Sequence, residues 1–252
     1  MQHDLVISPF GATATDMIEV AHYAEELGFG GVWTYDHMTG SMLGRGASHD
    51  AFTILGAMAA VTERVRIGPL VANMVNRHPM QLAVAMVTLQ SLSAGRAVLG
   101  IGAGASPGSR FATEQEAIGR RLLPGPQRRR QLVETIGVVR GLWHGCDRHV
   151  GEFFTVDESE PLGSHGDLPI IVGASGPETV ALAAKHADGV NLAVGPDRLD
   201  GLLSLIDSSA LPAGFEISTH SPADLAHPTG GCLLYTSPSP RDATLSRMPS
   251  SA

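Results

Sequence analysis

Short apolar runs alternate with segments of helical periodicity along most of the chain. Seven apolar runs predict buried strands, at residues 5–7, 31–34, 65–71, 97–101, 170–172, 189–192 and 215–217. Between them, apolar residues recur at spacings of three and four, which is typical of amphipathic helices. The predicted helices cover residues 17–27, 49–61, 79–89, 132–142, 177–184 and 199–206.

Polar residues, glycine and proline mark the ends of several of these elements. Asp16 followed by Glu19 predicts a capping box with Asp16 as the cap, and Gly28 predicts the end of that helix. Pro79 stands where proline is tolerated, at the first turn of a helix, and Gly95 is expected to end it.

The alternation favours a parallel sheet with helices outside it, because short continuous apolar runs suit strands that are buried on both faces. The early strands recur at roughly the 30 residues of one unit in a (β/α)8 barrel. A doubly wound sheet is the alternative. Residues 143–168 break the rhythm and predict an insertion with a small hairpin around Gly151.

The last part of the chain differs in character. Residues 1–228 carry the alternation, whereas residues 229–252 show neither a helical nor a strand period. Pro238, Pro240 and Pro249 remove hydrogen-bond donors there. We expect a disordered, non-native tail that resembles a translated read-through peptide, with a natural disordered tail as the alternative. The barrel would then lack its last strand and helix and stay open between residues 5–7 and 215–217.

Composition narrows the class of protein. The 252 residues are 43% hydrophobic and 17% charged, which suits a packed globular core. A net charge of −8 argues against nucleic-acid binding, and no apolar run reaches the length of a membrane span. No secretory signal is visible, so we expect a cytoplasmic protein. Two cysteines make no disulfide framework, and the histidines show no metal-binding spacing.

Ligands bind at the carboxyl ends of the strands in both candidate folds. This rule selects Ser8, Asp36–His37, residues 70–73, 102–105, 173–176 and 193–195, and Thr219–His220. Among these, Asp36 and His37 form the adjacent pair suited to proton chemistry, since histidine titrates near neutral pH and a carboxylate can orient it. Two solvated loop residues are the alternative.

Two glycine-containing turns are candidate binding elements. Gly102, Ala103 and Gly104 follow a strand, but Pro107 and Gly108 replace the helix that a dinucleotide motif requires. We therefore expect a flat ligand to lie against this backbone. Gly173, Ala174, Ser175 and Gly176 lead directly into a predicted helix, whose free N–H groups favour an anion such as phosphate. A plain strand-to-helix turn is the alternative.

Several segments, taken together, resemble the bacterial luciferase-like flavin oxidoreductases. They are residues 24–33 followed by Asp36–His37, residues 64–68 running to 77–79, residues 88–104, residues 142–145 and residues 187–191. The resemblance runs from the start of the chain to about residue 225, with the segments in family order. It implies a (β/α)8 barrel with an insertion and a flavin or deazaflavin at its carboxyl end.

The combination of Trp33, Asp36–His37 and the turn at residues 102–104 is most similar to the branch that uses coenzyme F420, a 5-deazaflavin. The resemblance implies that His37 faces the reactive ring. It also implies a strand bulge near Leu70 and Val71, often with a cis peptide bond, behind the ring. The phosphate-binding turn would be residues 173–176.

One position departs from the pattern. Some sugar-phosphate dehydrogenases of this branch carry a catalytic glutamate where this chain has Ala105, which leaves the substrate open. We expect an F420-dependent oxidoreductase that transfers a hydride to or from a small organic substrate, with Asp36 holding the His37 imidazole. An FMN-dependent monooxygenase and a non-catalytic flavin-binding or inactive truncated fragment are the alternatives. Whether the chain forms a homodimer stays open.

Overall fold

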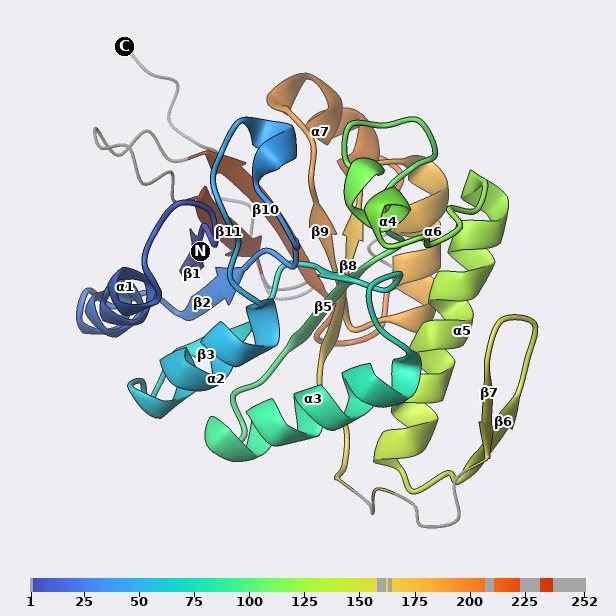
Figure 1. Cartoon of the computed structure of the whole chain (residues 1–252), viewed down its shortest axis with the longest axis horizontal. Helices are drawn as coiled ribbons and strands as arrows, with labels where there is room; N and C mark the ends of the chain where they lie inside the picture. The colour runs from blue at the N-terminus through green and yellow to red at the C-terminus, as the bar shows by residue number, and fades with distance from the viewer. Residues whose placement is uncertain (1, 158–161, 163–164, 207–210, 223–231, 238–252) are drawn as a thin grey trace.

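A computed structural model describes residues 2–157, 162, 165–206, 211–222 and 232–237 (Figure 1). The strands are β1 (Gln2–Ile7), β2 (Gly31–Thr34), β3 (Arg66–Pro69), β4 (Ala72–Asn73), β5 (Leu99–Gly102), β6 (Arg148–Val150), β7 (Thr155–Asp157), β8 (Ile170–Ala174), β9 (Gly189–Leu192), β10 (Glu216–Pro222) and β11 (Cys232–Ser237). The helices are α1 (Ala14–Glu26), α2 (Ala51–Ala60), α3 (Pro79–Leu92), α4 (Thr113–Ala117), α5 (Gly125–Trp143), α6 (Pro177–His186) and α7 (Pro196–Leu203), with a 3₁₀ turn at Ser41–Leu43.

The principal sheet closes into a barrel. Its strand order is β3-β2-β1-β11-β10-β9-β8-β5-β4, and a parallel bridge between Ile67 and Ala97 joins its two ends. The Val98 N–H donates to the Ile67 carbonyl at 2.9 Å, which extends that junction. Because β4 continues β3 after a short interruption, the ring has eight strand positions. The predicted (β/α)8 barrel is therefore confirmed in its architecture.

The expectation of an open barrel is wrong, because a strand, β11, occupies the eighth position. β11 pairs antiparallel with β1, for example Leu5 with Leu233, and also with β10, so both edges are covered. The sequence pattern missed this strand because prolines dominate the tail, yet Pro238 and the later prolines all lie beyond Ser237. No eighth parallel strand occurs within the described ranges. The predicted disorder of residues 229–231 and 238–252 lies outside them.

Helix α1 begins one turn earlier than the pattern suggested. The Thr13 side chain accepts from the Asp16 N–H, and the Asp16 carboxylate accepts from the Thr13 N–H. Asp16 is therefore the third helical residue of the capping box and not its cap. A threonine hydroxyl can also cap a helix, which is why both assignments fit the same sequence. Gly28, with φ +84°, follows the helix as predicted.

The remaining elements agree with the pattern within a few residues. Pro79 opens α3, and Gly95 follows its end with φ +93°. The insertion contains the predicted hairpin, formed by β6 and β7 around Gly151. The strand expected at residues 65–71 ends at Pro69, because a cis peptide bond joins Leu70 to Val71.

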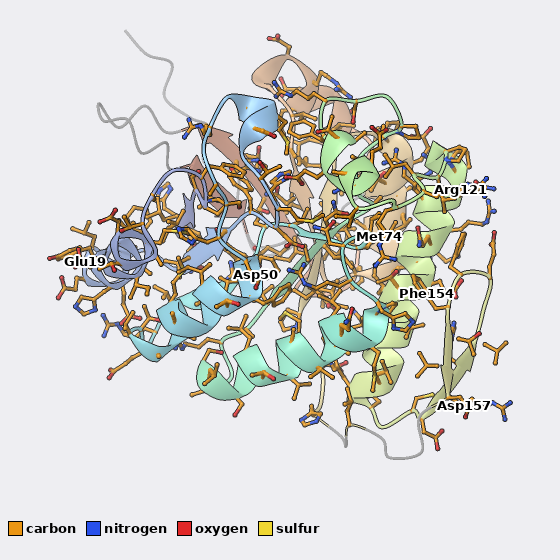
Figure 2. The ribbon with its side chains drawn as sticks, viewed as in Figure 1. Glu19, Asp50, Met74, Arg121, Phe154 and Asp157 are labelled. Carbon is orange, nitrogen blue, oxygen red and sulfur yellow. The ribbon has the colours of Figure 1, made fainter. Side chains whose placement is uncertain are left out.

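Apolar side chains fill two layers. Most of the core lies between the strands and the helices, where Met74 is 2% exposed, whereas Glu19 and Asp157 lie at the periphery (Figure 2). A smaller cluster of Val6, Trp33, Leu70, Val98 and Ile171 fills the barrel itself. This inner cluster closes the centre of the barrel, so a ligand can enter only from an end.

Ion pairs and hydrogen bonds close the amino-terminal end of the barrel. The buried Asp4 carboxylate accepts from Trp33 Nε1 at 3.0 Å and from Arg66 at 3.2 Å, and Arg66 also donates to Glu216 at 2.6 Å. Burial raises the pKa of Asp4, although the Arg66 charge opposes that rise.

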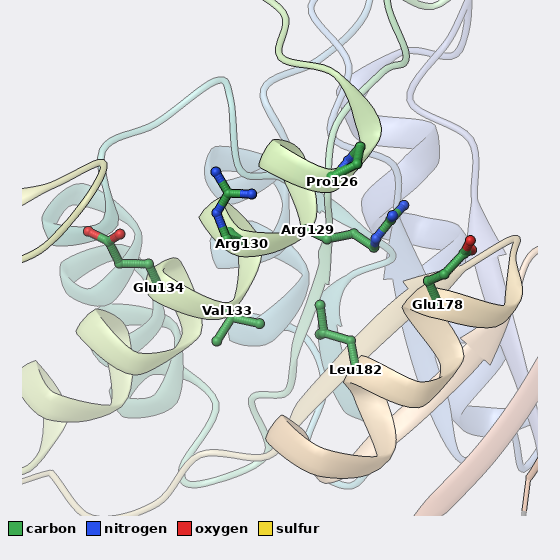
Figure 3. Close-up of a pocket in the computed structure, with 7 residues that line it drawn as sticks. All are labelled: Pro126, Arg129, Arg130, Val133, Glu134, Glu178 and Leu182. Atoms are coloured by element: carbon green, nitrogen blue, oxygen red, sulfur yellow. The ribbon is translucent and has the colours of Figure 1, made fainter.

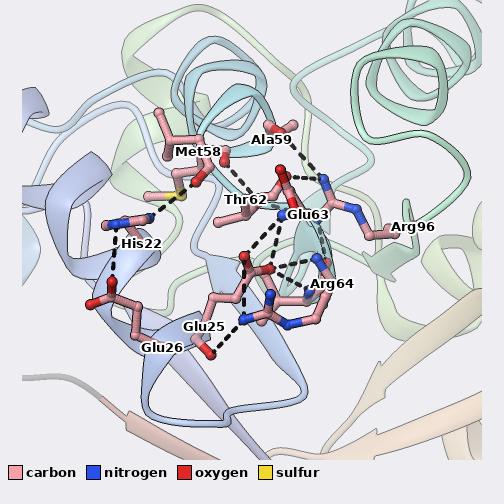
Figure 4. Close-up of polar contacts among 11 residues, drawn as sticks. His22, Glu25, Glu26, Met58, Ala59, Thr62, Glu63, Arg64 and Arg96 are labelled. Carbon is pink, nitrogen blue, oxygen red and sulfur yellow. Dashed lines mark hydrogen bonds and ion pairs between the residues drawn. The ribbon is translucent and has the colours of Figure 1, made fainter.

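A second polar network surrounds the turn before β3 (Figure 4). The Glu25 carboxylate accepts backbone N–H groups from Glu63, Arg64 and Val65. Arg96 donates to the carbonyls of Ala59, Thr62 and Val65. Burial works to raise the pKa of Glu25, but the N–H donors and the Arg64 charge together hold it below its ordinary value.

Candidate active site at the carboxyl end of the barrel

A cavity of about 450 Å³ opens at the carboxyl ends of the strands. Its walls combine apolar side chains and backbone with a few polar groups, the usual make-up of a small-molecule site. The lining residues are Tyr35, Asp36, His37, Leu70, Val71, Asn73, Gly102, Ala103, Gly104, Ala105, Phe111, Gly173, Ala174, Ser175, Asn191, Ala193 and His220. The predicted site residues are therefore brought together, apart from Gly176, which caps α6 just outside the lining.

His37 is held by a residue that the sequence analysis did not select. Its Nδ1 lies 2.9 Å from Oε2 of Glu114, on the short helix α4. The other oxygen of that carboxylate accepts the Thr39 N–H at 2.9 Å, and the Glu114 side chain is fully buried. Two fixed contacts give the carboxylate one orientation. In a neutral imidazole this contact places the proton on Nδ1 and leaves the lone pair on Nε2.

The expectation that Asp36 holds the imidazole is wrong. Asp36 instead forms an ion pair with Arg77 at 2.5 Å and accepts the Asn73 N–H at 2.9 Å. Arg77 also reaches Asp50 at 2.8 Å. Asp36 and His37 are adjacent in sequence and line the same cavity, but their side chains have different partners. Asp36 thus fixes the strand end and the loop that follows β4.

Val71 occupies the space above the glycine turns. A Cβ added to Gly102 would come within 2.7 Å of the Val71 side chain, and one added to Gly173 within 2.9 Å. The absence of a Cβ at these glycines therefore leaves room for the Val71 side chain, which itself lines the cavity. Part of the Gly102 backbone, which was expected to contact a ligand directly, is covered by this side chain. The cis bond predicted near Leu70 and Val71 is present. Together these residues form an apolar cradle on one side of the cavity.

The turn from β8 into α6 offers backbone donors. Gly176 caps α6 without a side-chain hydrogen bond, and Pro177 takes the first helical position. Arg198 donates to the Ser175 carbonyl at 2.7 Å, which brings a positive charge to the turn. Free N–H groups, the helix dipole and a nearby cation all favour an anion at this turn.

Aromatic rings line the wall beyond the cradle. Phe111, His37, Phe10, Tyr35 and His220 form a continuous series, with neighbouring ring centroids 5.6 to 6.4 Å apart. His220 lies on β10, and its Nδ1 is 2.8 Å from Asn191 Oδ1. Burial lowers the pKa of His220, which favours the neutral ring.

A second hollow, of about 530 Å³, lies between α5 and α6 (Figure 3). It is lined by Pro126, Arg129, Arg130, Val133, Glu134, Glu178 and Leu182. Two of its charged residues already hold the β6–β7 hairpin, since Arg130 pairs with Glu152 at 2.7 Å and Glu134 accepts the Phe154 N–H at 2.9 Å. The carboxyl-end cavity is therefore the stronger candidate for chemistry.

The family model for luciferase-like monooxygenases matches residues 3–233 of this chain. The chain belongs to the luciferase-like monooxygenase family. Its barrel with an inserted hairpin and its carboxyl-end cavity fit that membership. Among the described residues, no helix has the length and apolarity that crossing a membrane requires.

Several proteins similar to this chain carry names that refer to coenzyme F420. An F420-dependent glucose-6-phosphate dehydrogenase of Microbacterium testaceum (strain StLB037) is 32% identical over 206 residues, which cover 79% of this chain and 59% of that protein. The chain thus spans about three fifths of this relative's length.

Solved structures share the fold. An F420-dependent secondary alcohol dehydrogenase in complex with an F420-acetone adduct superposes with a TM-score of 0.70 at 22% identity, covering 85% of this chain and 68% of that one. The monooxygenase RslO1 from Streptomyces bottropensis gives a TM-score of 0.66 at 27% identity, covering 83% and 66%.

Proposed function

We propose that this chain carries the barrel of an F420-dependent oxidoreductase, which transfers a hydride between the deazaflavin and a small organic substrate. The observation that carries the proposal is the His37–Glu114 pair, which shares one cavity with the Val71 cradle. The names of relatives about 30% identical, such as the F420-dependent glucose-6-phosphate dehydrogenase, support the choice of coenzyme.

The residues of the cavity suit a flat ring joined to a phosphate-bearing chain. Leu70 and Val71 give an apolar surface against which a ring can lie, with Gly102 and Gly104 beside it. Ser175 and the N–H groups at the start of α6 would hold the phosphate, with the Arg198 charge nearby. A bound deazaflavin supplies a two-electron hydride carrier, and the protein supplies position and electrostatics.

His37 would then move the proton that accompanies the hydride. With Nδ1–H directed at Glu114, its Nε2 can accept a proton from a substrate hydroxyl or return one to a carbonyl oxygen. Glu114 would stabilise the imidazolium while that proton is held. Asp36, neutralised by Arg77, takes no part in the transfer and instead keeps the loop after β4 in place.

An FMN-dependent monooxygenase is the second candidate, because the structurally similar RslO1 is a monooxygenase and is 27% identical. Parallel fluorescence titrations of the full chain with F420 and FMN test the choice. We expect F420 to bind at least about tenfold more tightly. Equal or reversed affinities, together with oxygen-dependent turnover of reduced FMN, would favour the monooxygenase. Binding without turnover would favour a non-catalytic flavin-binding fragment, and binding of neither compound would favour an inactive truncated fragment.

A further inference from the structure

Arg128, on α5, holds the turn that follows β5 from outside the cavity. Its Nη1 donates to the Gly104 carbonyl at 2.7 Å, and its Nη2 donates to Ser106 Oγ at 2.7 Å. Gly104 and Ala105 line the cavity, whereas Arg128 does not. The guanidinium group therefore lies behind the turn, on the side away from a bound ligand.

The contact with Arg128 sets the direction of the peptide group between Gly104 and Ala105. Among the described residues the cis bond lies between Leu70 and Val71, so the bond between Gly104 and Ala105 is trans. In a planar trans peptide the C=O and N–H bonds point in opposite directions. Because the Gly104 carbonyl is turned towards Arg128, the Ala105 N–H is turned towards the cavity. Within the described part of the chain, this N–H donates to no protein group.

Gly104 has little freedom to turn this peptide group away. Its φ is +72°, and an added Cβ would come within 2.7 Å of the Val75 side chain and 2.9 Å of Asn73 Oδ1. Gly104 thus packs closely against the loop after β4, while α5 supplies the donor to its carbonyl. Two distant segments therefore fix the Ala105 N–H before any ligand binds, and a donor that is already in place needs no reorganisation.

Arg128 also acts on this peptide group through its charge. Burial and the neighbouring Arg129 charge lower the pKa of Arg128, and its buried Nε has no hydrogen-bond partner. Its printed partners are a carbonyl and a hydroxyl, so no carboxylate neutralises it among the described residues. A charged donor on the Gly104 carbonyl polarises the peptide and strengthens the Ala105 N–H as a donor.

We propose that Arg128 is a positioning residue that directs the Ala105 N–H at a carbonyl oxygen of the bound ligand. This inference rests on the proposed function of the same cavity. A carbonyl oxygen is offered both by the pyrimidine part of a deazaflavin ring and by a ketone or aldehyde substrate. The first experiment distinguishes these two sources.

The amide resonance of Ala105 reports the proposed bond directly. Spectra of the full chain labelled with ¹⁵N-alanine are recorded without ligand, with oxidised F420, and with oxidised F420 and acetone. We expect a downfield shift of the Ala105 proton and a weaker temperature dependence once the acceptor is bound. A change with F420 alone identifies the coenzyme as the acceptor, and a change that requires acetone identifies the substrate. An Ala105 signal that responds to neither addition would overturn the inference.

The second experiment uses Arg128→Ala, with Arg129→Ala as the matched control. In Arg128→Ala the shift of Ala105 should disappear, and the ligand identified by the spectra should bind about tenfold more weakly, because the N–H is no longer directed at its oxygen. Millimolar guanidinium chloride should restore the shift and the affinity. Tetramethylammonium chloride should restore neither, since it has no N–H donor. The control should behave as the wild type does.

The results separate a positioning role from a merely structural one. A loss of affinity that guanidinium does not restore, or that Arg129→Ala shares, would overturn the inference, and so would an unchanged affinity in Arg128→Ala. If the alanine variant is unstable, Arg128→Lys repeats the comparison, because lysine keeps the charge without the planar pair of donors. Full retention of the Ala105 shift in that variant would overturn the inference. Failure of the wild type to bind F420 would overturn the proposed function first.

Discussion

The two ends of the barrel use their polar side chains differently. At the amino-terminal end, Asp4, Arg66 and Glu216 pair with one another, and the inner cluster closes the space above them. At the carboxyl end, His37 and His220 each spend one nitrogen on a protein partner and keep the other for the cavity. The charges of the first end are paired within the protein, although Asp4 Oδ1 and Arg66 Nε make no hydrogen bond there, whereas the imidazoles of the second end line a cavity that a ligand can enter.

The largest effect should follow from opening the amino-terminal network. Arg66→Leu leaves the Asp4 carboxylate buried beside Glu216 with Trp33 as its remaining donor. It should lower the free energy of unfolding by about 3 kcal/mol, because a buried charge loses its partner. Urea denaturation measures this loss, and F420 affinity should stay unchanged. The exposed pair of Arg130 and Glu152 provides the control, since Arg130→Leu should leave stability where it was. A fall in F420 affinity for Arg66→Leu would contradict the division between the two ends.

Substitution of His37 should give the reverse pattern. His37→Ala should reduce turnover about 10²-fold, equivalent to about 2.7 kcal/mol, because the proton acceptor is lost. F420 affinity and stability should change little. The assay follows coenzyme reduction with the alcohol that the wild type oxidises fastest. Undiminished turnover would show that His37 is a loop residue without a chemical role.

Glu25 should make the amino-terminal end sensitive to acid. Its folded-state pKa is lowered by the three backbone donors, so its stabilising effect is present above the unfolded pKa and is lost as pH falls through the folded pKa. Glu25→Gln should cost about 2 kcal/mol at neutral pH, because one uncharged amide oxygen replaces the charged carboxylate that accepts three backbone N–H groups. The difference from wild type should disappear as pH falls through the folded-state pKa of Glu25, because the carboxylate is then protonated. Glu26→Gln, at an exposed neighbouring position, is the control, and a cost independent of pH would refute this account.

Glu114→Gln tests whether the Glu114 carboxylate sets the tautomer of His37 at the carboxyl end. Glutamine can still accept the Thr39 N–H, but its amide group then donates to His37 Nδ1 and moves the ring proton to Nε2. We expect ¹⁵N spectra to show the changed tautomer and turnover to fall at least about tenfold, because Nε2 can no longer accept a proton. Asp36→Asn should leave the tautomer unchanged. A changed tautomer in that control would restore Asp36 as the partner of His37.

The smallest effect concerns a position that belongs to neither end. Gly137 lies in the middle of α5, and an added Cβ would meet no atom within 4 Å. Gly137→Ala should raise the free energy of unfolding by about 0.5–1 kcal/mol, since alanine loses less conformational entropy in a helix. Thermal unfolding would detect it, with F420 affinity unchanged. Destabilisation would indicate packing that the helix surface does not reveal.

From the sequence, the architecture could be predicted more fully than the side-chain contacts of the site. Apolar runs and helical spacing located the strands and helices because burial imposes those periods, and the carboxyl-end rule placed His37, Val71 and Ser175 around one cavity. Glu114 escaped because it lies 77 residues from His37, on a five-residue helix without apolar periodicity. The Asp36–Arg77 pair escaped for a related reason, since adjacency in sequence does not reveal which way a side chain turns.

The eighth strand shows a further limit. β11 runs against its neighbours, and no periodic signal distinguished its six residues from the proline-containing segment around them. What decides its place is the pair of open edges offered by β1 and β10, a property of the assembled barrel and not of the local sequence. Local pattern therefore cannot identify such a strand.

The direction of β11 fixes where a fused partner would sit. The strand begins beside Val6, near the mouth of the cavity, and its last paired residues lie beside Gln2 and Ile217, at the opposite face of the molecule. A parallel eighth strand would deliver the following residues to the mouth. An affinity handle or surface linker joined directly after Ser237 would therefore depart from the closed face, and an immobilised protein would present its open cavity to the solution.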